Sequence, residues 1–268
     1  MKQIPNLFTI LNLIFGCMAI VYVLMPGQSI LVLEDGGTTD VILPERIWQG
    51  ALFIFAAAVI DFLDGFLARL MKAQSEMGKQ LDSLSDVVSF GVAPGVILYQ
   101  LLRMAYAQQT NGLDVSAVTL MPAFLFTAAV AWRLAKFNIS TNQTSSFKGV
   151  PSPAAGLVVA SLPLVMMTEL SAGSLLLSPY LINEWVLYGL ILFLAWLMLS
   201  NRTFMAMKFK NFSFAGNSLV YILLALSVAA IVFLKWLAVP VIFILYLLLS
   251  AFAKEAPQKV ASDTGMRA

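Results

Sequence analysis

Apolar residues dominate the chain in long runs that are separated by short polar segments. A helix that crosses a bilayer needs about 20 mostly apolar residues. Eight runs approach or reach that length: residues 7–26, 47–70, 82–104, 118–138, 153–170, 184–200, 217–234 and 236–253. The last two runs meet at Lys235 and Trp236, so we expect a tight turn there. The pattern predicts an all-α fold, a polytopic transmembrane helix bundle of about eight spans.

The polar segments show how the chain is divided. Residues 27–46 are rich in acidic residues and glycine and are expected to form a loop, and residues 255–268 are expected to form a polar cytoplasmic tail. Only Lys2 precedes the first apolar run, and no small-x-small cleavage site follows it, so we expect a retained helix rather than a signal peptide. With no internal repeat, residues 1–254 are predicted to form one transmembrane domain.

Composition strengthens the membrane assignment and narrows the chemistry. The chain is 60% hydrophobic and 11% charged, whereas soluble domains carry about 25% charged residues. A net charge of +2 without a long basic run gives no indication of nucleic acid as a partner. The chain contains no histidine and a single cysteine, Cys17. A general base must therefore be a carboxylate, lysine, tyrosine, cysteine or water, and a metal site must be rich in oxygen.

The basic residues are distributed unevenly between the two sides of the predicted bundle. If the N-terminus is cytoplasmic and eight helices cross, only Arg46, Arg103 and Lys235 of the 16 lysines and arginines face the other side. Cytoplasmic loops of membrane proteins carry such an excess of lysine and arginine. We therefore expect a multi-pass protein of the cell membrane with both termini in the cytoplasm. A soluble protein with buried core helices is disfavoured, because too little polar sequence remains to cover it.

Four aspartates stand close together in the sequence at the predicted cytoplasmic boundary. Asp61 and Asp64 lie near the end of the second apolar run, and Asp82 and Asp86 lie at the start of the third. Residues three or four positions apart share one face of a helix. Because the connection between the two helices is short, they should be antiparallel neighbours whose acidic pairs can face each other.

Such a cluster needs positive charge close by. An ionisable group inside a bilayer costs about 2.5–3.5 kcal/mol on insertion scales, and Arg69 alone cannot balance four carboxylates. One or two hard divalent cations with oxygen ligands, Mg²⁺ or Mn²⁺, would do so. Two such ions can hold the attacking and leaving oxygens in phosphoryl transfer. Gly65 and Ala68 leave room on the same helix for a ligand to approach.

The spacing of these residues, D-x2-D-G-x2-A-R-x8-G-x3-D-x3-D, resembles the motif of the CDP-alcohol phosphotransferase family at every fixed position. The resemblance covers roughly residues 4–160. It implies that Asp61, Asp64, Asp82 and Asp86 bind two divalent cations and that Asp86 is also the general base. It further implies a homodimer and a nucleotide site lined by Gly65, Ala68, Arg69 and Gly78.

Three further stretches indicate the acceptor alcohol. Residues 4–13, residues 83–94, and residues 133–138 followed by 147–153 resemble the bacterial and archaeal phosphatidylserine synthases of that family. The resemblance implies transfer of the phosphatidyl group from CDP-diacylglycerol to L-serine, with CMP as the second product and the active site facing the cytoplasm. The third stretch departs from its relatives at Lys136, where a second arginine is usual. Lysine keeps the charge there but cannot make a bidentate contact.

Polar residues near the motif suggest two more contacts, each with an alternative. The carboxylate of serine needs a cation, which Arg133, Lys136 and Lys148 could supply, although basic residues at helix ends also serve as membrane anchors. Asn6 and Thr9 could bind the nucleotide, although both residue types also cap helices.

Two other functions remain open from the sequence. The same family includes enzymes whose acceptor is glycerol 3-phosphate or an inositol phosphate. A membrane transporter with an acidic cluster is disfavoured, because transporters usually combine repeated halves with broken helices at the midplane, and neither is found here.

Overall fold

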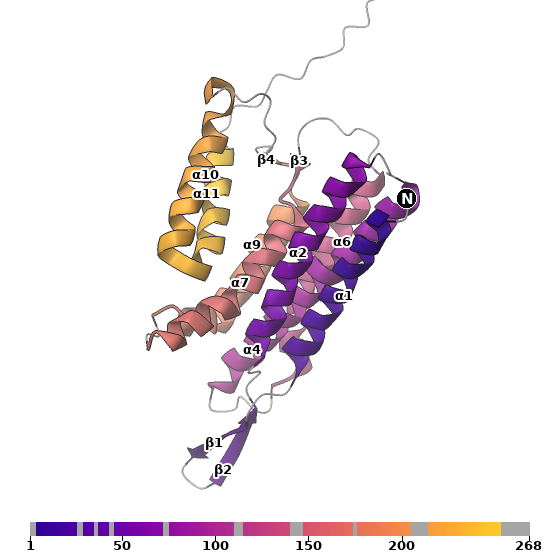
Figure 1. Cartoon of the computed structure of the whole chain (residues 1–268). Helices are drawn as coiled ribbons and strands as arrows, with labels where there is room; N and C mark the ends of the chain where they lie inside the picture. Colours follow the sequence, from indigo (N-terminus) through magenta and orange to yellow (C-terminus); the bar gives the residue numbers. More distant parts are fainter. Residues whose placement is uncertain are drawn as a thin grey trace, which may run out of the picture.

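The fold is a bundle of helices with two small β-pairs (Figure 1). The computed structural model describes residues 4–25, 29–34, 37–42, 46–71, 75–109, 115–139, 147–173, 176–204 and 214–252. The α-helices in these ranges are α1 (Ile4–Leu24), α2 (Ile47–Leu70), α3 (Glu76–Asp86), α4 (Ala93–Ala107), α5 (Ala117–Leu120), α6 (Ala123–Ile139), α7 (Ser152–Ser171), α8 (Ser178–Leu181), α9 (Glu184–Leu199), α10 (Phe214–Leu234) and α11 (Ala238–Phe252).

Each of the eight apolar runs contains a helix, which confirms the predicted all-helical bundle. Five helical stretches of the described chain are long and apolar enough to cross a membrane: Pro5–Leu24, Ile47–Leu70, Glu76–Ala107, Ser152–Ser171 and Ser218–Ala251. The chain is therefore an integral membrane protein. The last stretch joins α10 to α11 through the 3₁₀ turn η3 (Lys235–Leu237), and α6 and α9 are shorter, so a count of eight spans stays a prediction.

Local sequence explains where several elements begin and turn. The third helix starts at Glu76, earlier than predicted, because the Ser75 side chain caps it by accepting a hydrogen bond of 3.0 Å from the Gly78 amide. Lys235 has a φ of 50°, in the left-handed region, which marks the tight turn expected between the last two helices. The tail at residues 255–268 lies outside the described residues.

The strands mark the two ends of the bundle. Strands β1 (Ser29–Glu34) and β2 (Gly37–Ile42) form an antiparallel hairpin, so the prediction of a loop was wrong for these residues. Figure 1 places this hairpin at the end opposite the N-terminus. Strands β3 (Phe147–Lys148) and β4 (Thr203–Phe204) pair beside the other end.

The π-helical segment η1 (Val87–Val92) lies at the centre of the packing between α3 and α4. It contacts α1, α4, α6 and α7. Gly156 of α7 lies so close that a β-carbon there would meet the Phe90 carbonyl oxygen at 3.0 Å. The widened turn leaves the Gly91 carbonyl to accept a hydrogen bond of 2.9 Å from the Thr127 hydroxyl on α6. These contacts fix the position of the helical segment that directly follows Asp86, the last aspartate of the motif.

Candidate metal centre

Helices α2 and α3 bring together three of the four motif aspartates. Ligand oxygens of Asp61, Asp82 and Asp86 all lie within 4.8 Å of one another, with Asp86 buried and the other two half-buried. The two helices are neighbours in sequence and meet at their facing ends, as the motif spacing predicts. Three carboxylates at this separation form an all-oxygen donor set, which suits a hard divalent cation such as Mg²⁺ or Mn²⁺.

Asp64 lies beside this group but already has a partner. Its side chain is 6% exposed and accepts a hydrogen bond from the Thr9 hydroxyl of α1. It is close enough to Asp61 and Asp82 to interact electrostatically with both. The fourth aspartate thus borders the cluster, with one oxygen held by α1.

Unsatisfied polar atoms beside the cluster support the binding of a cation or a polar ligand. Within the described residues, Asp86 Oδ1 and both amide atoms of Asn12 are buried without a hydrogen-bond partner. Asn12 is fully buried and lies near Asp86 without meeting hydrogen-bond geometry. A buried polar group left unpaired costs about 1–3 kcal/mol. The residues present therefore fit a site that a ligand completes.

Helix α1 is tied to α3 and η1 through two buried serines. The Ser85 hydroxyl donates to the Thr9 carbonyl at 2.7 Å, and the Ser89 hydroxyl donates to the Asn12 carbonyl at 3.0 Å. These two hydrogen bonds fix the position of α1 along its own axis relative to the aspartates. The sequence did not single out Asn12; the available signal was one amide inside an apolar run.

Arg133 on α6 adds a positively charged group to the site. Its Nη1 donates to the Ser152 hydroxyl at 2.9 Å at the start of α7. It interacts electrostatically with Asp86, and its Nε is buried without a hydrogen-bond partner among the described residues. The residue predicted to meet an acceptor carboxylate is therefore close enough to the predicted general base to interact with it electrostatically. Ser152 was not predicted, because its partner lies in another helix.

The other two predicted cations are not seen at this position. Lys136 is exposed, and its Nζ donates to the Asn201 side chain at 2.8 Å, just after α9. Lys148 belongs to β3 and pairs with Thr203 of β4, and its side chain lies outside the described part. Of the three, within the described residues, only Arg133 interacts electrostatically with an aspartate of the cluster.

The residues predicted for the nucleotide lie around the ends of α2 and α3. Gly65 is exposed, and a β-carbon there would meet nothing within 4 Å. Arg69 donates through Nε to the Gly65 carbonyl at 2.8 Å, and Ala68 is half-buried. Across from them, a β-carbon at Gly78 would lie 3.0 Å from the Asn6 side-chain oxygen. The side of α2 that carries Gly65 is thus open, and Asn6 of α1 lies close to Gly78 near the start of α3.

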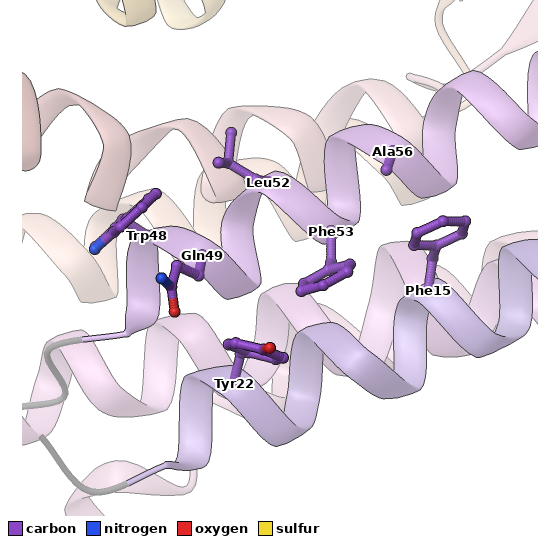
Figure 2. A pocket seen from close by; sticks show the side chains of 7 residues that line it. All are labelled: Phe15, Tyr22, Trp48, Gln49, Leu52, Phe53 and Ala56. Carbon is purple, nitrogen blue, oxygen red and sulfur yellow. The ribbon is translucent and has the colours of Figure 1, made fainter.

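A separate groove of about 440 Å³ lies between α1 and α2 (Figure 2). Its side chains are mainly aromatic and apolar, and none is acidic or basic: Phe15, Tyr22, Trp48, Gln49, Leu52, Phe53 and Ala56. The Tyr22 and Phe53 rings lie 5.0 Å apart between their centroids. Because it holds no candidate metal ligand, this groove is distinct from the carboxylate cluster.

Comparison with known proteins agrees with the site. The family model described as CDP-alcohol phosphatidyltransferase matches residues 2–249. A Helicobacter pylori protein named CDP-diacylglycerol–serine O-phosphatidyltransferase is 34% identical over 248 residues, which cover 91% of this chain and 87% of that protein. A Bacillus subtilis protein of the same name is 32% identical over 162 residues, 60% of this chain and 76% of the relative.

The matched region contains the whole acidic motif, Arg133 and most of the last helix. The family match thus spans the aspartates of α2 and α3 that converge at the site. The chain belongs to the CDP-alcohol phosphatidyltransferase family.

Proposed function

We propose that the protein transfers the phosphatidyl group of CDP-diacylglycerol to the hydroxyl of L-serine, forming phosphatidylserine and releasing CMP. The observation that carries this proposal is the position of Arg133. This half-buried arginine, whose Nε has no hydrogen-bond partner among the described residues, interacts electrostatically with Asp86, one of the three clustered carboxylates. An acceptor with a carboxylate satisfies this arrangement, and the serine synthases named above add support at the level of similarity.

The donor site is proposed at the open side of α2. Gly65, Ala68 and Arg69 would face the nucleotide and its phosphates, with Gly78 opposite. Asn6 and Thr9 would support this site from α1. When bound, two Mg²⁺ or Mn²⁺ ions would neutralise the phosphate charge, held by Asp61, Asp64, Asp82 and Asp86.

Asp86 is proposed to accept the proton of the serine hydroxyl. Its Oδ1 has no hydrogen-bond partner among the described residues. As the serine oxygen forms a bond to the phosphorus of the phosphatidyl group, the bond from that phosphorus to CMP breaks, and the proton moves to the Asp86 carboxylate. Arg133 would hold the serine carboxylate, so that the hydroxyl stays beside Asp86.

We propose the topology that the basic residues favour: one domain over residues 1–254, eight spans, and both termini and the active site in the cytoplasm, with a homodimer as the assembly. In intact cells, single cysteines placed in a chain with Cys17 replaced would report the sides. A thiol at residue 75 should be protected from a membrane-impermeant reagent, and a thiol at residue 173 should react. The reverse pattern would overturn the orientation.

An acceptor panel tests the reaction itself. Purified protein in lipid nanodiscs that contain CDP-diacylglycerol would receive labelled serine, glycerol 3-phosphate or an inositol phosphate, with Mn²⁺ or with a chelator. We expect lipid product and CMP from serine only, and neither product in chelator. A product from another acceptor but not from serine would overturn the serine assignment. Absence of metal-dependent CMP release with every acceptor would favour the transporter alternative.

Metal binding can be tested without turnover. Because a bound cation offsets the clustered carboxylates, Mn²⁺ should raise the melting temperature of the wild-type protein in detergent. The shift should disappear in an Asp61→Asn/Asp82→Asn variant and persist in Glu184→Gln, a control at the start of α9, outside the aspartate cluster. An equal shift in all three proteins would contradict a site at these aspartates.

A further inference from the structure

The groove between α1 and α2 follows the first half of α2, whereas the aspartates of that helix lie in its second half. Figure 2 shows Trp48, Gln49 and Tyr22 together at one end of the groove and Phe15 and Ala56 at the other. From Trp48 to Ala56 the groove extends for about 12 Å along the helix. That length is most of the depth of one leaflet of a bilayer, about 15 Å.

The two helices form a fixed wall for this groove. Their backbones approach closely at Gly50, where a β-carbon would lie 2.8 Å from the Ala19 carbonyl oxygen. The ring of Phe53 lies 5.0 Å from that of Tyr22 and 5.9 Å from that of Phe15, between centroids, so aromatic side chains continue along the groove. Leu52 beside them is exposed. In a membrane-spanning bundle, such a surface suits a hydrocarbon chain that lies parallel to the helices.

The end of the groove at Trp48 is polar. Gln49 Oε1 is buried there without a hydrogen-bond partner among the described residues. One turn earlier lies Arg46, whose carbonyl accepts a hydrogen bond of 3.0 Å from the Gln49 amide. The exposed side chain of Arg46 reaches from the start of α2 to the end of α1, where its Nη1 lies 3.7 Å from the sulfur of Met25. The guanidinium therefore lies across the end of the helix pair that forms the groove.

Positive charge at this end of the groove is not balanced within the described part of the chain. A thioether sulfur is only a weak acceptor, and no described carboxylate pairs with Arg46. Helix α2 also begins without a side-chain cap and without an acidic residue in its first turn. An arginine beside a free helix N-terminus favours a phosphate group. Tryptophan and tyrosine, here Trp48 and Tyr22, are typical of the depth at which lipid head groups lie.

We infer that this groove binds an anionic glycerophospholipid such as phosphatidylglycerol. Its phosphate lies at Arg46 and the start of α2, a hydroxyl of its head group donates to Gln49, and one acyl chain follows Phe53 toward Ala56. Arg46 is about 22 Å from Asp61 along α2, so a donor lipid whose phosphates reach the aspartates cannot place them at Arg46. The inference adds a second lipid site and goes beyond the proposed function.

Native mass spectrometry of the purified full chain in detergent tests the site without turnover. The probes are phosphatidylglycerol and phosphatidylcholine with the same acyl chains, of which only the first has a net negative charge and head-group hydroxyls. The wild-type protein should bind one phosphatidylglycerol about fivefold more tightly than phosphatidylcholine, the effect of one basic residue near a membrane surface. Arg46→Gln should lose this preference. Arg103→Gln, which changes an exposed arginine of α4 that does not line the groove, should keep it.

A second variant tests the groove itself. Ala56→Phe places a ring where the acyl chain would lie, and displacement of two methylene groups should weaken the binding of both lipids about tenfold. Ala128→Phe, on an exposed position of α6, should bind them as the wild type does. The melting temperatures of the two variants show whether both are folded, and Arg46→Gln tests the site independently.

Three results would overturn the inference. The first is equal binding of the two lipids by the wild-type protein, or an unchanged preference in Arg46→Gln. The second is a loss of dimer in Ala56→Phe with unchanged lipid binding, which would assign the groove to a second copy of the chain. The third is a higher KM for CDP-diacylglycerol in Ala56→Phe with unchanged phosphatidylglycerol binding, which would assign it to the donor's acyl chain. None of these measurements involves serine, so a failure of the proposed acceptor is seen separately.

Discussion

The hydroxyl of Thr9 on α1 donates a hydrogen bond to the carboxylate of Asp64 on α2, 55 positions further along the chain. Thr9 also bonds to the Pro5 carbonyl at 3.2 Å, and its own carbonyl accepts from Ser85 on α3. One residue thus joins the three helices that surround the carboxylates. Since Thr9 was predicted as a contact of the nucleotide, its contact with Asp64 adds a second role for the same side chain.

Replacing Thr9 with valine should weaken the metal centre while keeping the shape of the side chain. Asp64 would lose its neutral donor, so its orientation toward the other aspartates would be less well fixed. We expect the Mn²⁺ concentration for half-maximal activity to rise about tenfold, the lower end of the range for loss of such a supporting contact. Thr9→Ser, which retains the hydroxyl, should stay near wild type. Equal metal dependence in both variants would show that the hydroxyl does not support the metal site.

Asp86→Asn should remove the proposed proton acceptor with little change in volume. General-base catalysis contributes about 10²- to 10⁴-fold to a rate, so serine-dependent CMP release should fall at least 100-fold. The Glu184→Gln variant, which changes a half-buried carboxylate at the start of α9, outside the aspartate cluster, should keep full activity. Turnover by Asp86→Asn at the wild-type rate would exclude Asp86 as the base.

Arg133→Lys tests the fork geometry of the guanidinium. Lysine keeps the charge but cannot bind Ser152 and a carboxylate in the same plane. The serine KM should rise about tenfold or more, as expected when a charge-assisted bond is lost, with the KM for CDP-diacylglycerol nearly unchanged. Lys136→Ala, one turn along α6 and exposed, should change the serine KM by less than about twofold. A larger effect at Lys136 than at Arg133 would place the acceptor on the other cation.

Two helical glycines offer a matched test of the packing around η1. A β-carbon at Gly156 would lie 3.0 Å from the Phe90 carbonyl oxygen, whereas one at Gly189 would meet nothing within 4 Å. Gly156→Ala should destabilise the protein by about 1–3 kcal/mol through overpacking. Gly189→Ala should be neutral or stabilising by up to about 1 kcal/mol, because alanine has the higher helix propensity.

Unfolding in detergent micelles, followed by circular dichroism, measures both changes. If Gly156→Ala is as stable as Gly189→Ala, the backbones of α7 and η1 are not in the close contact described here.

The helices were predictable because membrane helices are encoded by local composition. The run at 47–70 coincides with α2, and the motif spacing was enough to place Asp61 opposite Asp82 and Asp86. The hairpin at β1 and β2 was missed, because a polar segment with glycines is also typical of an irregular loop. Local pattern does not show whether two adjoining apolar helices each cross a membrane.

The parts of the site that the sequence did not predict are contacts between segments that lie far apart in the chain. Asn12 and Ser152 belong to two different helices and carry no shared motif, so only the packing brings them near Asp86 and Arg133. The charge of Lys136 and its position near Arg133 suggested the same role for both residues, and in the structure Lys136 donates to the Asn201 side chain.

The π-helical turn after Asp86 has a consequence for changes in chain length. A π turn accommodates one residue more than an α-helical turn, and one residue corresponds to a rotation of about 100° around a helix. Deleting a single residue from Val87–Val92 would therefore let the turn relax into an ordinary helix while the acidic end stays aligned with the apolar end. A one-residue deletion in the regular α-helical part of α3 or α4 has no extra residue to absorb it, and would rotate the aspartates by about 100° relative to the contacts that α4 makes in the bundle.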